Sequence, residues 1–151
     1  MKWVLGVLLL SNLSLADTLV GKGSVTVGKS EYPYDVTLVM NDDLDKKTTD
    51  ITETLDMKDG KEAKIYSYRV NWQADYKTFS LTEKDVTIGG GYCRKVKDES
   101  AWCDYHLQTQ VGPLHINMFY DGATKSLHRM GDLVTVDGVK FLADDLETKA
   151  K

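Results

Sequence analysis

Apolar and polar side chains alternate along most of the chain, most clearly over residues 36–40, 66–72 and 114–118. A period of two is typical of β-strands that bury one face, because successive side chains point to opposite sides of a sheet. The pattern predicts nine or ten strands, near residues 18–27, 34–41, 48–57, 62–72, 77–82, 86–94, 101–109, 113–120, 124–130 and 133–142.

Short turn signals separate these strands. Asp59-Gly60, Asp121-Gly122 and Asp137-Gly138 are pairs that favour two-residue hairpin turns, because the turn needs positive φ angles. Consecutive strands joined by short turns pair with their neighbours, which gives an antiparallel meander. A meander of 8–10 strands removes its exposed edges by closing. We therefore predict an all-β, closed up-and-down barrel.

Two segments leave alternatives open. Residues 44–56 also fit a helical spacing of apolar positions, so a short helical lid is an alternative to a strand there. The many threonines of this segment favour the strand. The charged tail, residues 142–151, is expected to fray or to form one helical turn.

The first 16 residues have the three parts of a secretory signal peptide. Lys2 precedes an apolar run over residues 4–10, and Ser14 and Ala16 supply the small residues of a cleavage site. The run is too short to span a bilayer, which takes about 20 apolar residues. We expect cleavage after Ala16, export to the periplasm or the extracellular space, and a single domain over residues 17–151 with no membrane span.

Charge and cysteine content narrow the class of protein further. The chain has 19 basic and 23 acidic residues and a net charge of −4, which argues against nucleic acid as a partner. Its two cysteines, Cys93 and Cys103, flank a polar segment that a hairpin would close. An even cysteine count in an exported protein predicts a disulfide between them.

The predicted turns also assign side chains to faces. With Asp59-Gly60 as the turn, Ile51 faces Tyr68 and Glu53 faces Tyr66 on the inner side. With Cys93 opposite Cys103, large side chains lie over Gly89 and Gly91, and a bulge in the glycine run 89–91 is expected. The predicted inward set is Leu19, Val25, Val27, Val36, Leu38, Met40, Ile51, Leu55, Tyr66, Tyr68, Val70, Trp72, Phe79, Leu81, Tyr105, Leu107, Leu114, Ile116, Met118 and Leu127.

An aromatic stripe inside a barrel is a candidate ligand site, because such sites are apolar and hold a few polar groups. Tyr66, Tyr68, Trp72 and Phe79 would surround a small apolar ligand, with Glu53 as its polar anchor. The alternative is that these rings simply fill a solid core.

The three histidines form a second candidate site. The Asp121-Gly122 turn would place His115 opposite His128, with His106 beside them on the neighbouring strand. Imidazoles on adjacent strands can share a zinc or copper ion. The alternative is a solvated polar face without metal.

No catalytic or cofactor motif occurs in the sequence, so we expect a protein that is not an enzyme and needs no cofactor. The first hypothesis is a carrier or sensor of a small apolar ligand. The second is a protein-binding module, such as an inhibitor of an envelope or secreted enzyme, that uses the loops of a solid barrel and the hairpin 94–102.

Export signal, length, meander and disulfide together resemble the plan of the lipocalin-like (calycin) barrels. The Gly-x-Trp signature of lipocalins is absent, since Gly21-Lys22-Gly23 lacks the tryptophan. The resemblance implies a barrel with a ligand inside.

Overall fold

The computed structural model describes residues 16–97 and 99–148, which form antiparallel strands joined by turns. The predicted signal peptide and its cleavage fall on residues 1–16 and so lie outside the described residues, apart from the backbone of Ala16. The strands are β1 (Ala16–Val27), β2 (Ser30–Asp43), β3 (Thr48–Asp56), β4 (Lys64–Trp72), β5 (Thr78–Glu83), β6 (Val86–Lys97), β7 (Ser100–Thr109), β8 (Gly112–Asp121), β9 (Ser126–Thr135) and β10 (Gly138–Thr148).

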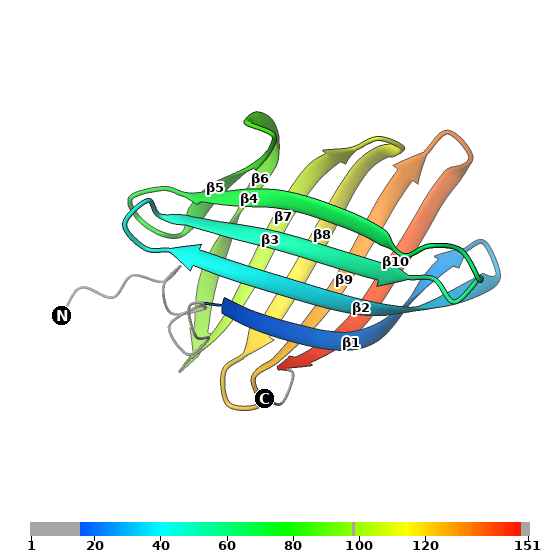
Figure 1. Cartoon of the computed structure of the whole chain (residues 1–151), viewed down its shortest axis with the longest axis horizontal. Helices are drawn as coiled ribbons and strands as arrows, with labels where there is room; N and C mark the ends of the chain where they lie inside the picture. The colour runs from blue at the N-terminus through cyan, green and yellow to red at the C-terminus, as the bar shows by residue number, and fades with distance from the viewer. Residues whose placement is uncertain (1–15, 98, 149–151) are drawn as a thin grey trace.

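Each strand pairs with its neighbours in the chain, and β1 also pairs with β10, which closes the barrel. The predicted closed up-and-down barrel is therefore confirmed. In Figure 1, β1 to β4 form the near wall and β6 to β9 the far wall, and the strands of the two walls cross at a steep angle. Residues 48–56 form β3, so the helical alternative for that segment is wrong.

The registers of the β3–β4 and β6–β7 hairpins agree with the prediction. Ile51 faces Tyr68, Glu53 faces Tyr66, and Cys93 faces Cys103. The bulge between β5 and β6 lies just before the glycine run rather than within it, because Leu81 pairs with Gly89 while Thr82 pairs with Thr87. This leaves Ile88 unpaired and packed on the core.

The last two strands begin and end later than predicted. Asp121 pairs with Ser126, so four residues separate β8 from β9 where a two-residue turn was expected. The predicted strands 124–130 and 133–142 are therefore shifted to 126–135 and 138–148. The segment 142–148, expected to fray, instead continues β10 and pairs with residues 19–25 of β1. The partner of this segment is β1, which is distant in the sequence and becomes its neighbour only because the barrel closes.

The hydrophobic core lies inside the barrel, and every strand contributes buried or partly buried side chains to it. Leu19, Leu81 and Leu146 are nearly inaccessible to solvent. Two members of the predicted inward set are partly open to solvent: Val27 is 38% exposed and Tyr66 is 44% exposed, since both lie near the opposite end of the barrel from the cavity described below.

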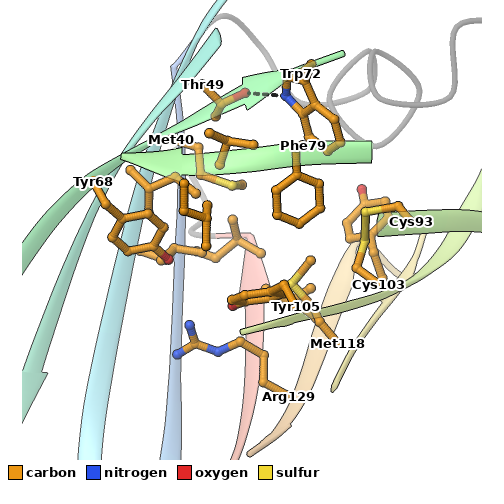
Figure 2. Close-up of a pocket in the computed structure, with 17 residues that line it drawn as sticks. Met40, Thr49, Tyr68, Trp72, Phe79, Cys93, Cys103, Tyr105, Met118 and Arg129 are labelled. Carbon is orange, nitrogen blue, oxygen red and sulfur yellow. Dashed lines mark hydrogen bonds between the residues drawn. A yellow bond between two sulfur atoms is a disulfide. The ribbon is translucent and has the colours of Figure 1, made fainter. Parts of the chain in front are cut away.

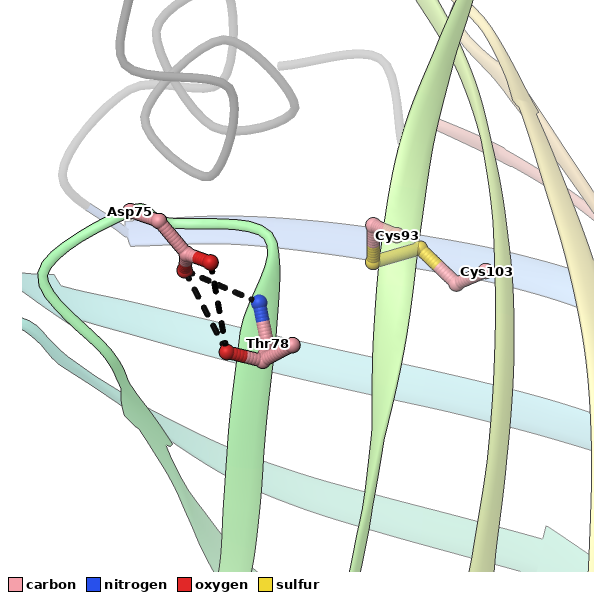
Figure 3. Close-up of a disulfide and its surroundings, with 4 residues drawn as sticks. All are labelled: Asp75, Thr78, Cys93 and Cys103. Carbon is pink, nitrogen blue, oxygen red and sulfur yellow. Dashed lines mark hydrogen bonds between the residues drawn. A yellow bond between two sulfur atoms is a disulfide. The ribbon is translucent and has the colours of Figure 1, made fainter.

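The predicted disulfide joins Cys93 to Cys103 across β6 and β7 (Figure 3). Closing a loop this short stabilises the fold by about 2–3 kcal/mol on the chain-entropy model. The turn between β4 and β5 lies beside the disulfide, because the Cys93 N–H donates to the Lys77 carbonyl at 2.7 Å. Asp75 closes that turn by accepting hydrogen bonds from the backbone N–H of Thr78 at 3.2 Å and from its hydroxyl at 3.3 Å.

Candidate functional site

The barrel contains a cavity of about 90 Å³ near one of its ends. That end, which we call the Trp72 end, is formed by the start of β1 and by the turns after β2, β4, β6 and β8. Aliphatic and aromatic side chains from both walls line the cavity, together with the disulfide, as Figure 2 shows. Arg129, the charged residue in the lining, lies on the side of the cavity away from Trp72 and Thr49.

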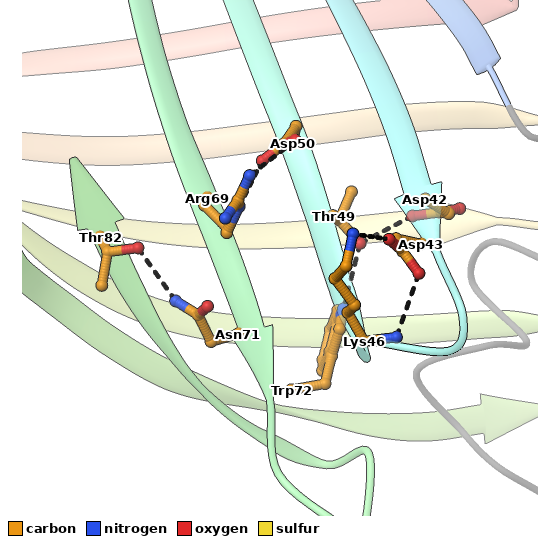
Figure 4. Close-up of polar contacts among 9 residues, drawn as sticks. All are labelled: Asp42, Asp43, Lys46, Thr49, Asp50, Arg69, Asn71, Trp72 and Thr82. Atoms are coloured by element: carbon orange, nitrogen blue, oxygen red, sulfur yellow. Dashed lines mark hydrogen bonds and ion pairs between the residues drawn. The ribbon is translucent and has the colours of Figure 1, made fainter. Parts of the chain in front are cut away.

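Hydrogen bonds hold Trp72 at this end. Its indole N–H donates to the Thr49 hydroxyl at 3.1 Å, and that hydroxyl donates to Asp42 at 2.7 Å (Figure 4). Phe79 packs edge-to-face on Trp72, with ring centroids 5.0 Å apart, and on Tyr105, at 6.0 Å. Each such pair adds about 0.5–1.5 kcal/mol beyond area burial. One wall of the cavity is therefore a fixed aromatic surface.

A buried ionic cluster, centred on Arg129, lies on the side of the cavity away from Trp72. Arg129 donates from Nε and Nη2 to the two carboxylate oxygens of Asp144, at 2.8 and 2.7 Å, and from Nη2 to Glu53 at 2.7 Å. The exposed fractions of these side chains are 6% for Arg129, 4% for Asp144 and 14% for Glu53. Tyr34 completes the cluster by donating its hydroxyl to Asp144 at 2.8 Å.

Gly23 makes room for this cluster. It pairs with Tyr34 on β2 and with Asp144 on β10, so the two side chains flank it from neighbouring strands. A Cβ at Gly23 would lie 2.5 Å from the Asp144 Cβ and 2.7 Å from the Tyr34 Cζ. Because glycine has no side chain, Tyr34 and Asp144 can meet across β1.

Burial and charge fix the protonation of these groups. Burial raises the pKa of Tyr34, and the Asp144 carboxylate raises it further. Burial likewise raises the pKa of Tyr105 to about 12 and that of Tyr68 well above its usual value. Burial alone would lower the pKa of Arg129, but Glu53 and Asp144 outweigh it and raise that pKa. At neutral pH Arg129 is therefore a cation. The phenols of Tyr34, Tyr68 and Tyr105 are uncharged.

The structure places three of the predicted ligand-binding residues, Tyr68, Trp72 and Phe79, around the cavity. Tyr66 is half exposed nearer the other end of the barrel and is not among the lining residues. Glu53, predicted as a polar anchor, is paired with Arg129 and does not line the cavity.

The histidines do not meet as predicted. His106 does face His115, but His128 faces Phe119, because the loop after β8 is longer than a two-residue turn. His128 instead contacts Asp145, and His115 lies between Asp104 and Asp132. Among residues 16–97 and 99–148, no three His, Cys, Asp or Glu side chains are grouped so as to hold a metal ion.

His115 should be charged at a higher pH than a free imidazole. The hydrogen bond from Nε2 to Asp104, at 3.0 Å, raises the pKa of His115 above 6.5, and Asp132 raises it further. A raised folded-state pKa adds stability that is complete below 6.5 and is lost as pH rises through the folded value. Since the side chain is 43% exposed, we expect at most about 1 kcal/mol.

This expectation is checked by an NMR titration of the His115 ring protons and by urea unfolding at pH 6 and pH 8. His115→Gln should remove the extra stability at pH 6 while changing little at pH 8. A His115 pKa at or below 6.5 would contradict the prediction.

Four important residues escaped the sequence-based prediction: Tyr34, Tyr120, Arg129 and Asp144. Tyr34, Tyr120 and Arg129 lie two residues from Val36, Met118 and Leu127, so alternation alone put them on the inner face. Arg129 was left out because charged residues are rarely buried unless paired. Asp144 lay in the segment expected to fray.

Comparisons with known proteins give the fold only. No protein-family model matches the chain, and no curated protein matches it by sequence. In the part of the chain that the structure describes, we find no helix of the length and apolarity that a membrane span requires. Among solved structures, the chain is similar to one reported as the crystal structure of Rv2717c from M. tuberculosis, with a TM-score of 0.70 and 15% sequence identity over 94% of this chain and 98% of that one.

Proposed function

We propose that this protein is an exported binding protein that holds a small, largely apolar molecule inside the barrel at the Trp72 end, and that it acts by binding rather than by catalysis. The observation that carries the proposal is the apolar cavity enclosed by both walls of the barrel. An aromatic and aliphatic lining with few polar groups is typical of ligand sites. A solid barrel, which the alternative of a loop-based inhibitor needs, would fill this space.

The size of the cavity limits the ligand. A cavity of about 150 Å³ holds benzene, and this one is about 90 Å³. The cavity as it stands therefore suits a molecule of a few heavy atoms. Met40 and Met118 line it, and because methionine is flexible and unbranched, their movement would admit a longer ligand.

The disulfide supports export, because disulfides persist in oxidising compartments outside the cytosol. The predicted signal peptide points the same way. In the periplasm or outside the cell, such a protein would carry or sense its ligand without help from a cofactor.

The first test is native mass spectrometry of the protein purified from its own exporting host. A mass above that of the oxidised chain from Asp17 to Lys151 would report a retained molecule. The same protein, labelled with ¹³C in its methionine methyl groups, is then titrated with xenon, an apolar probe of suitable size. We expect the Met40 and Met118 signals to shift, while Met130, which is 68% exposed on the outer face, serves as the internal reference.

Filling the cavity should weaken this response. Met118→Phe adds bulk at the lining, and we expect it to weaken xenon binding roughly tenfold, the effect of about one methylene in an apolar pocket. Met130→Phe is the matched control and should leave binding unchanged. Bare chain mass together with unmoved Met40 and Met118 signals would contradict the proposed function and direct the search to partner proteins.

A further inference from the structure

We propose that the ligand is an uncharged molecule with one hydrogen-bonding atom, which meets the Tyr120 hydroxyl, and that the barrel discriminates against carboxylates. This inference rests on the proposed function and adds the chemical class of the ligand. It follows from one buried hydroxyl and from the charges at the two ends of the cavity.

Tyr120 lines the cavity and is 2% exposed. Its hydroxyl is the one buried side-chain polar atom without a hydrogen-bond partner among the residues that the structure describes. Buried polar atoms are nearly always paired, since leaving one unpaired is costly. The Ser100 hydroxyl accepts the Gly122 N–H at 3.3 Å and makes no hydrogen bond with Tyr120. A ligand atom in the cavity would supply the missing partner.

Three acidic groups act on Tyr120 at the Trp72 end. After burial, the carboxylates of Glu99, Asp17 and Asp121 are the groups that raise the pKa of Tyr120. The hydroxyl therefore keeps its proton at neutral pH and can donate it to an acceptor on the ligand. A carboxylate placed there would meet like charges and would lose its water.

The other side of the cavity offers no free anion site either. Arg129 is the charged residue in the lining, and it already binds two carboxylates, Glu53 and Asp144. One cation against two anions leaves this cluster with an excess negative charge, so a third carboxylate is disfavoured. An ammonium group would also lose its water, and the apolar lining offers it no free carboxylate, because Glu53 and Asp144 already bind Arg129. An uncharged polar group near Tyr120 avoids both costs.

The test uses four probes with one carbon skeleton: 1-butanol, butanoate, butylammonium and 1-chlorobutane, which is apolar. Binding is measured from the Met40 and Met118 methyl signals of the exported chain at pH 7. We expect 1-butanol to bind at least roughly tenfold more tightly than butanoate or butylammonium, an effect typical of one discriminating polar contact.

Tyr120→Phe removes only the hydroxyl. It should weaken 1-butanol binding about three- to tenfold and leave 1-chlorobutane binding unchanged, which also shows that the cavity is intact. Tyr32→Phe is the matched control, because Tyr32 is 50% exposed. Equal affinity for butanoate and 1-butanol, or unchanged 1-butanol binding in Tyr120→Phe, would overturn this inference alone. Failure of all four probes, 1-chlorobutane included, would overturn the proposed function itself.

Discussion

Replacing Arg129 with methionine should destabilise the protein by about 3–5 kcal/mol at pH 7, because it leaves two buried carboxylates without their cation. Glu53 and Asp144 are 14% and 4% exposed, so water cannot replace the guanidinium. Urea unfolding of the variant and the parent protein at pH 7 measures this loss.

The control is Arg69→Met on the barrel surface. Arg69 pairs with Asp50 through two hydrogen bonds, at 2.6 and 3.1 Å (Figure 4), yet both side chains are about half exposed. Its loss should cost at most about 1 kcal/mol. Adding Glu53→Gln and Asp144→Asn to Arg129→Met should recover at least half of the lost stability. Equal costs for Arg129→Met and Arg69→Met would refute the role assigned to the buried cluster.

The sequence predicted the class of fold because alternation and turn signals are local. Where a hairpin was correctly registered, as for Ile51 with Tyr68, whole faces were also correct, since a strand has only two. The hairpin between β8 and β9 failed because Asp121-Gly122 was taken for the whole turn, whereas Asp121 pairs with Ser126. The shift is an even number of residues, so side chains stay on their predicted faces. His128, however, lies opposite Phe119 rather than His115, and the three histidines do not meet.

The site itself was less accessible to prediction, because it depends on closure of the barrel. Arg129 and Asp144 are on neighbouring strands, but Glu53 lies 76 residues before Arg129 and reaches it only across the barrel. No local pattern records such a contact. Likewise, nothing in the run Gly21-Lys22-Gly23 indicates that Gly23 lies between Tyr34 and Asp144. Its role became visible only once β10 was placed beside β1.

Gly23→Ala provides the direct test of that role, and we expect it to cost about 2–4 kcal/mol. The added methyl group would overlap the Asp144 Cβ and the Tyr34 Cζ, at 2.5 and 2.7 Å, and the Ala143 carbonyl oxygen at 2.5 Å. Overpacking of this kind costs about 1–3 kcal/mol. Separating Tyr34 from Asp144 also breaks a buried hydrogen bond, which adds about 1 kcal/mol. Urea unfolding at pH 7 measures the sum.

Gly28→Ala is the matched control. Gly28 has a φ of 61°, but nothing lies within 4 Å of its Cβ position, so only the cost of positive φ applies, about 1 kcal/mol. A double-mutant cycle with Tyr34→Phe then separates the two contributions. In that background the hydrogen bond is already lost, so Gly23→Ala should cost about 1 kcal/mol less than it does alone. An equal cost in both backgrounds would mean that Gly23 matters for strand packing and not for bringing Tyr34 to Asp144.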